Sequence, residues 1–444
     1  MPQQKRSTKE QINNLIEFRQ AIYENGLSDY RDAQFELIDA LLANQRVNSF
    51  AELSLSPLCR RAWASAYMAI ESGNQEVNWI RSRLMEQLPP SEVVVLPIDT
   101  TVWPHPSART LAGLVYEHSP TAAKGKHTAV KGHVYSLLAW IPERGSSWAL
   151  PLASTRLPPA ETAVDIGVTQ VKTACRQQRE GTRLAIVGDG KYGNHRFFGP
   201  LRDEPCAVVA RLRRDRVLYG PPPPYGGRGR PRKHGRRFAF KEPETWSEPE
   251  SEMHFSDERW GQVHLRAWSR LHAKQDADTV FTVLRAEVQC QRDKRPAPIW
   301  LGFIGAAGYT IHDVWLWFDH RWSIEPSIRF RKRRLYWTLP AFQASERCDR
   351  WTWLTELAYW QLFLARDLVR DRPLPWQKAQ TKLTPGRVLQ SMGPLFAQLG
   401  SPTSPVKQRG KSPGWSKGRK RSPPTRFKVV KRSKKRAKSA RLNA

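Results

Sequence analysis

The chain has 444 residues, of which 40% are hydrophobic, so it is long enough for two or three domains with sizeable cores. Its 72 lysines and arginines outnumber its 41 acids, and the formal charge of +31 favours a polyanionic partner. Nucleic acid is the expected partner and an anionic membrane surface is the alternative. No apolar run approaches the roughly 20 residues of a membrane-spanning helix, and the first residues lack the apolar stretch of a signal peptide.

The cysteines indicate the redox compartment. Cys59, Cys175, Cys206, Cys290 and Cys348 are odd in number and widely spaced, and no two form a Cys-x-x-Cys pair. This pattern is typical of a protein in a reducing cytosol. It argues against a disulfide framework and against a structural zinc site.

Residues 1–90 are predicted to form a helical N-terminal domain. Ser7 and Glu10 have the spacing of a capping box before an amphipathic run that ends near Gly26. Further helices are predicted over about 30–44, over 58–72, and from Asn74 as N-cap to Leu88. Both a DNA-reading domain and a packing or dimerisation bundle fit this pattern, because no helix-turn-helix signature separates them.

After residue 90 short apolar runs alternate with a helical pattern, which indicates an α/β domain with a central sheet. Strands are predicted over 93–96, 134–141, 148–152, 184–187 and 206–212, and a helix over 160–177. Asp99 and Asp189 each follow one of these strands. The carboxyl end of such a strand is the usual ligand-facing position in a sheet, although a lone aspartate there is more often a turn or capping residue.

A basic, proline-rich segment over 220–275 is predicted to loop out of the sheet domain as an insertion. Its sequence Gly229-Arg230-Pro231, flanked by Arg228, Arg232 and Lys233, resembles an AT-hook, which lies in a narrow minor groove. Nonspecific phosphate contact is the commoner use of such a loop. Strands resume over 280–288 and 299–304.

The last residues, 401–444, carry 16 lysines and arginines and no acid. They are too polar to fold alone and are predicted to be a flexible arm that binds nucleic acid, with a solubilising tail as the alternative.

Four residues fall on one helical stripe: Phe318, Arg321, Glu325 and Lys332. Their spacings of three, four and seven place them within about 60° of one helix face. An acid between two cations suits a metal ion beside a phosphate. Pro326 directly follows Glu325, which predicts that the helix restarts near Ser323 or kinks at Glu325.

Together these residues resemble the DDE transposases of bacterial insertion sequences, whose third acid lies in the signature Tyr-x2-Arg-x3-Glu-x6-Lys. Arg321, Glu325 and Lys332 match at the same spacing, and Phe318 replaces the tyrosine. Asp99 resembles the first acid and Asp189 the second. The resemblance implies an RNase H-like α/β core with a β-rich insertion, a helical domain before it and a disordered basic tail after it. The implied boundaries are 1–90 for the helical domain, 91–219 and 276–400 for the two parts of the core, 220–275 for the insertion and 401–444 for the tail.

The resemblance also implies the chemistry. Two Mg2+ ions, replaceable by Mn2+, would be held by Asp99 as the bridging ligand and by Asp189 and Glu325 as flanking ligands. Arg321 and Lys332 would hold phosphates, and Phe318 would lie beside the DNA without the hydroxyl of the family's tyrosine.

The implied protein is a cytoplasmic, nucleoid-associated homodimer that acts in a synaptic complex on double-stranded DNA. It would cleave transposon ends and transfer the strands into target DNA. Two other readings stay open. One is a noncatalytic DNA-binding protein derived from a transposase, and the other is a nuclease of the same fold without joining activity.

Overall fold

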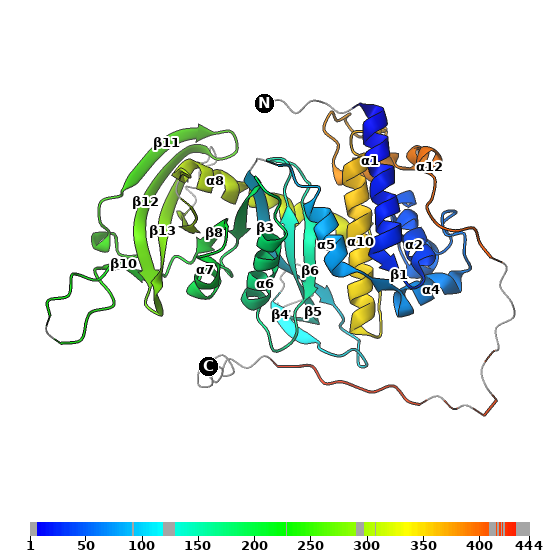
Figure 1. Ribbon diagram of the computed structural model, residues 1–444, viewed down its shortest axis with the longest axis horizontal. Coiled ribbons are helices and arrows are strands. Elements are labelled where there is room, and N and C mark those ends of the chain that lie inside the picture. Colours follow the sequence, from blue (N-terminus) through cyan, green and yellow to red (C-terminus); the bar gives the residue numbers. More distant parts are fainter. Residues whose placement is uncertain are drawn as a thin grey trace.

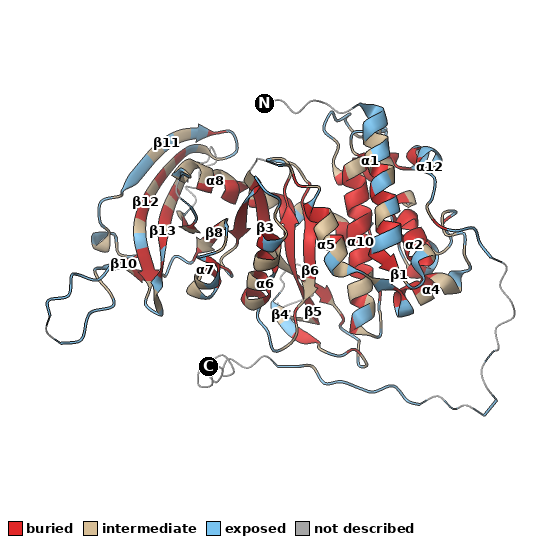
Figure 2. Ribbon diagram, viewed as in Figure 1, coloured by how far each residue is buried: buried red, intermediate tan, exposed pale blue. Residues whose placement is uncertain are grey.

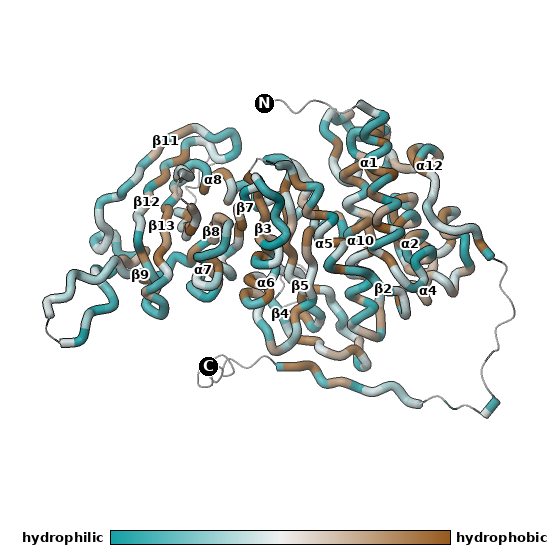
Figure 3. The backbone as a smooth tube through the Cα atoms, in the orientation of Figure 1, coloured by the Kyte–Doolittle hydropathy of each residue, from teal (hydrophilic) through white to brown (hydrophobic). Residues whose placement is uncertain are grey.

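The computed structural model shows a helical unit packed beside a large mixed sheet (Figure 1). The residues it describes are 7–90, 93–118, 129–227, 229–289, 297–306, 308–407, 414, 417–418, 420 and 422–431. Hydrophobic residues follow the central strands and the packed helices (Figure 3).

The N-terminal unit is helical, as predicted. The hydroxyl of Ser7 accepts a hydrogen bond from the Glu10 amide while the Glu10 carboxylate accepts one from the Ser7 amide, which confirms the capping box. The predicted N-cap at Asn74 is wrong, because Asn74 lies in a short strand and the next helix begins at Val77. The elements are α1 (Thr8–Ala21), the π-helical turn η1 (Ile22–Gly26), β1 (Leu27–Ser28), α2 (Arg31–Ala43), α3 (Phe50–Leu53), α4 (Trp63–Ser72), β2 (Asn74–Gln75) and α5 (Val77–Met85).

Among the described residues, one sheet contains twelve strands, which run in the order β10-β9-β12-β13-β14-β8-β7-β3-β5-β4, with β11 beside β12 and β6 beside β5. The neighbours β3, β7 and β8 are parallel, and their apolar runs are buried as expected for central parallel strands. The strands are β3 (Val93–Pro104), β4 (Val115–His118), β5 (Ala129–Trp140), β6 (Leu150–Arg156), β7 (Arg183–Gly188), β8 (Cys206–Leu212), β9 (Val217–Tyr219), β10 (Arg237–Ala239), β11 (Ser251–Asp257), β12 (Gly261–Ala273), β13 (Asp276–Gln289) and β14 (Ile299–Ile304).

Much of the segment expected to loop out instead extends this sheet. β12 pairs with β13 from Gln262↔Gln289 to Ala273↔Asp276, and β13 continues through β14 to β8. The expected boundary at residue 275 therefore falls in the turn between two paired strands. The loop between β9 and β10 carries the AT-hook-like residues. Among the described parts of this segment, it alone projects from the end of the sheet (Figure 1).

The helix α10 lies between the helical unit and the sheet (Figure 1). It packs against α1 and α2 on one side and against β6 on the other, and it is buried almost throughout (Figure 2). Its buried polar residues include Glu356 and Gln361, which are hydrogen-bonded to Ser154 and Arg19, as polar groups in an enclosed position require. The remaining helical elements are α6 (Ala163–Arg176), α7 (His195–Leu201), η2 (Pro243–Thr245), α8 (Ile311–His320), η3 (Arg321–Ser323), α9 (Ile324–Arg334), α10 (Ser345–Ala365), α11 (Pro385–Ser391) and α12 (Gly393–Leu399).

The described parts of the basic tail make defined contacts with the folded chain. Thr403 is buried, and its carbonyl oxygen accepts a hydrogen bond from Arg60. Further on, the Phe427 amide donates to the Arg109 carbonyl, and the Val430 amide donates to the Leu114 carbonyl. These described residues do not fit the expected disorder, because the tail packs on the helical unit and runs beside β4. Within the described chain, no helix combines the length and apolarity needed to cross a bilayer.

Candidate active site

Asp99 and Asp189 lie at the same level of two adjacent parallel strands. The pairing of β3 with β7 runs from Val93↔Arg183 to Ile98↔Gly188, and each acid is the next residue along the chain. The expectation that the first strand ends before Asp99 is wrong, because β3 continues beside β5 to Pro104. The end of β7 nevertheless places both acids at the carboxyl edge of the parallel strands, where ligands bind.

Glu325 comes from a helix that begins just before it. α8 ends at His320, the 3-10 turn η3 follows, and α9 starts at Ile324. Pro326 therefore lies in the first turn of α9, where its missing amide costs no helical hydrogen bond. This confirms the predicted restart near Ser323. It also means that the four-residue stripe is divided between α8, η3 and α9.

All three acids line one pocket of about 490 Å³. The pocket is also lined by four arginines, two of which follow β8 on the turn toward β9. Its lining residues are Asp99, Asp189, Gly190, Arg211, Leu212, Arg213, Arg214, Arg321, Trp322 and Glu325. The arrangement combines oxygen ligands for a cation with fixed positive charges for an anion.

The electrostatics of the pocket centre on Asp99. Burial and the nearby Asp189 carboxylate raise the pKa of Asp99 to about 6, against the opposing effects of a hydrogen bond from the Thr100 amide and of nearby cations. Arg321 Nη1 lies 3.9 Å from Asp99 Oδ2. Two carboxylates in one partly buried site repel each other, so a bound cation would favour their ionised forms.

Arg321 is a buried and well-supported cation. It is 6% exposed, and its guanidinium lies 5.7 Å from the ring centre of Phe318 and 5.3 Å from that of Trp322. These cation–π contacts fix its position beside Asp99.

The donor set is of the kind that binds divalent metal ions. Carboxylate oxygens are the ligands that Mg2+ prefers, and the repulsion between Asp99 and Asp189 supplies a reason to bind positive charge. The carboxylate oxygens of the three acids do not all lie within 4.8 Å of one another. Among the described residues, two other groups of potential metal ligands are that closely spaced.

Two residues of the predicted stripe lie elsewhere. Phe318 is 3% exposed and packs in the core formed by the sheet and α8. The expected contact of this ring with DNA is therefore wrong, and the ring has a packing role. The ammonium of Lys332 donates to the Val102 carbonyl on β3 at 2.8 Å, and burial lowers its pKa to about 8. Lys332 therefore ties α9 to β3 and does not line the acidic pocket, and its contact with a phosphate stays a prediction.

The AT-hook-like residues are on the protein surface. Arg230, Arg232 and Lys233 are exposed in the loop between β9 and β10, without helix or strand. Arg228 lies outside the described residues. The described members of this segment are thus accessible to DNA, and their role stays a prediction.

A run of arginines beside the acids was missed by the sequence analysis. A second pocket, of about 480 Å³, shares Asp189, Gly190 and Arg213 with the acidic pocket. A third pocket, of about 290 Å³, shares Asn194 and Arg216 with the second. The signal was present in the sequence, where the run over 211–216 contains four arginines directly at the end of a predicted strand.

The family model for DDE superfamily endonucleases matches residues 23–273, which is more than half of the chain. The chain belongs to the DDE superfamily of endonucleases. Membership implies a metal-dependent nuclease with DNA as its substrate, and the mixed α/β sheet is consistent with such a fold. The matched segment of this DDE endonuclease includes Asp99 and Asp189 and ends before Glu325.

Other comparisons add little. A solved structure described as the C-terminal lobe of a budding yeast Argonaute aligns with 76% of this DDE endonuclease at 8% identity and a TM-score of 0.22. The alignment spans 62% of that chain, and a similarity this low carries no argument. No curated protein matches the chain.

Proposed function

We propose that this DDE endonuclease is a DNA transposase, which cleaves the ends of a mobile element and joins them to target DNA. The observation that carries the proposal is the meeting of Asp99, Asp189 and Glu325 in one arginine-lined pocket. The spacing of Arg321, Glu325 and Lys332, which resembles the signature of insertion-sequence transposases, adds the preference for transposition.

In this proposal the three carboxylates hold two Mg2+ ions, or Mn2+ in their place. Bound ions of this kind supply Lewis acidity to a phosphodiester and activate water for attack. Arg321, fixed beside Asp99, offsets the negative charge of the scissile phosphate. Arg213 and Arg214, exposed at the rim, hold neighbouring phosphates of the backbone.

The joining of cleaved DNA ends to a target distinguishes a transposase from a nuclease of the same family. The purified protein would be incubated with Mg2+, a labelled duplex ending in the terminal repeat of its element, and a plasmid target. Plasmid-linked label on a denaturing gel is the expected product. Cleaved duplex without joined product would instead support the nuclease. Binding without any nicking would support the noncatalytic DNA-binding protein.

The proposed DNA path can be tested at the pocket rim. Replacing both Arg213 and Arg214 with alanine is expected to weaken DNA binding and to reduce the slope of log K against log salt by about 0.9 per arginine. The loss should be similar for unrelated duplexes, because phosphate contacts carry no sequence information. Fluorescence anisotropy over a potassium chloride series measures both effects.

A matched control for this test is Arg202→Ala. Arg202 has a half-exposed side chain paired with Asp203 at the end of α7, and it does not line the pocket. Its replacement is expected to leave the slope unchanged. Equal slopes for the wild-type protein and the Arg213/Arg214 variant would contradict the proposed path.

The tail offers a second test of DNA binding. Ending the chain after Lys431 removes six cations and keeps the described residues that pack beside β4. We expect weaker DNA binding and a salt slope reduced by up to about 5, because each phosphate contact contributes about 0.9. The matched control replaces the same six residues with glutamine at unchanged length. An unchanged slope in both proteins would show that these cations do not contact DNA.

A further inference from the structure

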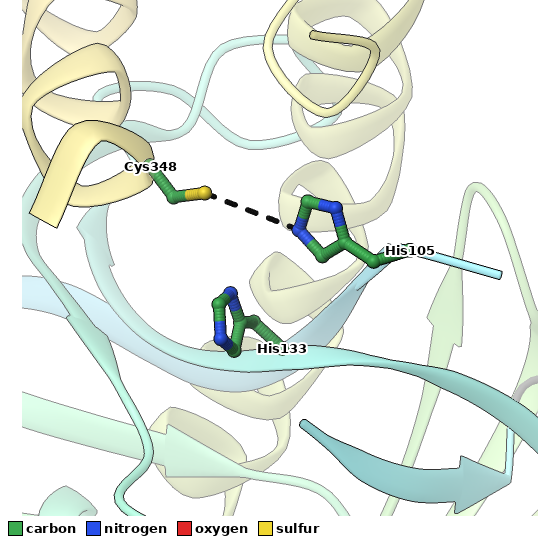
Figure 4. Close-up of side chains that lie close together, drawn as sticks. All are labelled: His105, His133 and Cys348. Atoms are coloured by element: carbon green, nitrogen blue, oxygen red, sulfur yellow. Dashed lines mark hydrogen bonds between the residues drawn. The ribbon is translucent and has the colours of Figure 1, made fainter. Parts of the chain in front are cut away.

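Away from the acidic pocket, three residues that commonly bind metals meet in the core (Figure 4). His105 directly follows β3, His133 lies in β5 and Cys348 lies in α10. One ligand atom from each lies within 4.8 Å of the others, and Cys348 Sγ is 4.0 Å from His105 Nε2. The three residues are 5%, 1% and 0% exposed, so the group is closed to bulk water.

The hydrogen bonding of His133 resembles that of a metal ligand. Its Nε2 lies 2.9 Å from the Ala112 carbonyl oxygen, which can only accept, so this nitrogen carries the proton. The other ring nitrogen, Nδ1, is then an unprotonated acceptor, and it is buried without a hydrogen-bond partner. A backbone carbonyl that holds the distal N–H of a histidine is the usual support of a metal-binding ring. A buried acceptor left without a donor is otherwise costly.

The protonation states of the group also suit a soft cation. Burial lowers the pKa of His105 to about 3 and lowers that of His133, so both rings are neutral and can donate lone pairs. Burial raises the pKa of the Cys348 thiol, and a coordinated metal ion would remove its proton.

We propose that His105, His133 and Cys348 bind one zinc ion. Two nitrogens and a sulfur suit zinc better than the magnesium expected at the carboxylates. Ligand atoms of a tetrahedral zinc site lie about 3.5 Å apart, so the observed 4.0 Å closes with a small movement of side chains. The proposal does not depend on transposition.

The three ligands come from three separate elements, which is why cysteine spacing alone argued against zinc. The ion would join β3 and β5 to α10. Because β3 also carries Asp99, six residues before His105, the zinc would brace the strand that supports the first acid. Its role is therefore structural, and its binding can be measured without any assay of activity.

The test uses the full chain without a histidine tag. After exhaustive dialysis, metal analysis by mass spectrometry is expected to find about one zinc ion per chain in the wild-type protein. Cys348→Ser is expected to lose at least about nine-tenths of this zinc. The matched control is Cys59→Ser. It removes a thiol in the helical unit that donates to the Glu36 carbonyl, and this variant is expected to keep the zinc.

Cobalt substitution makes the test independent of whether Cys348→Ser folds. Wild-type protein reloaded with Co2+ is expected to show a thiolate-to-cobalt charge-transfer band, which neither the acidic pocket nor the group of Glu252, His254 and His264 can produce. The variant Cys175→Ser/Cys206→Ser, which removes two thiols that contact each other elsewhere, is expected to keep the band. Absence of the band and of retained zinc in the wild-type protein would overturn the proposal. Full zinc retention in a folded Cys348→Ser variant would overturn it as well.

Discussion

Replacement of Asp99, Asp189 or Glu325 by its amide is expected to reduce Mg2+-dependent DNA cleavage by about 10³-fold or more. The three acids line one pocket, and each amide keeps the shape of the side chain while removing the charge that holds a cation. Rates measured with a labelled duplex, with and without EDTA, test this expectation. DNA binding in EDTA should persist, because the arginines of the pocket are untouched.

Asp203→Asn serves as the matched control for the three amide variants. The Asp203 side chain is 87% exposed, follows α7 and does not line the pocket. Its replacement is expected to leave cleavage unchanged. Full cleavage by all three pocket variants would end the assignment of these acids as metal ligands.

Breaking the ion pair between Arg331 and Glu356 is expected to destabilise the protein by about 3–5 kcal/mol. Arg331 Nη1 lies 3.3 Å from Glu356 Oε1, and both side chains are fully buried between α9 and α10. Burial raises the pKa of Glu356 to about 7, with Arg331 opposing the shift. Arg331→Met leaves this carboxyl group without its cation in the core, and we expect a Tm roughly 3–5 °C lower in thermal unfolding.

A double variant separates the charge from the packing. In Arg331→Met/Glu356→Leu no buried charge lacks a partner, so most of the lost stability should return. The surface control Arg202→Met breaks an exposed pair with Asp203 and should change the free energy of unfolding by no more than about 1 kcal/mol. Equal stability of the Arg331→Met variant and the wild-type protein would contradict the importance of the pair.

The sequence predicted best what depends on local chemistry. The capping box at Ser7 and the strand Cys206–Leu212 lie where the residues placed them, because a cap and a short apolar run are encoded by neighbours. The pairing of β12 with β13 depends on a partner outside the segment 220–275, so this segment, which contains β11 and β12, was assigned to a looped-out insertion. The continuation of β3 past Asp99 likewise depends on β5, which is remote in sequence.

For the candidate site, the acids were easier to predict than the cations. Asp99 and Asp189 follow apolar strands, and adjacent parallel strands bring them to one edge. Helical periodicity placed Lys332 with Glu325, but periodicity does not show which neighbour a long side chain reaches, and Lys332 reaches a carbonyl of β3. Arg213 and Arg214 were missed although they follow a predicted strand, because the place of their turn beside the acids depends on the pairing of strands that are distant in sequence.

The contact of the tail with β4 has a practical consequence. β4 ends the order of strands in the sheet, and Val430 forms a parallel bridge to Val115 there. Exposed strand edges are where protein chains add to one another and precipitate. Trimming the entire basic extension to obtain a cleaner preparation would uncover this edge, so a shortened protein should retain Val430 to stay dispersed in solution.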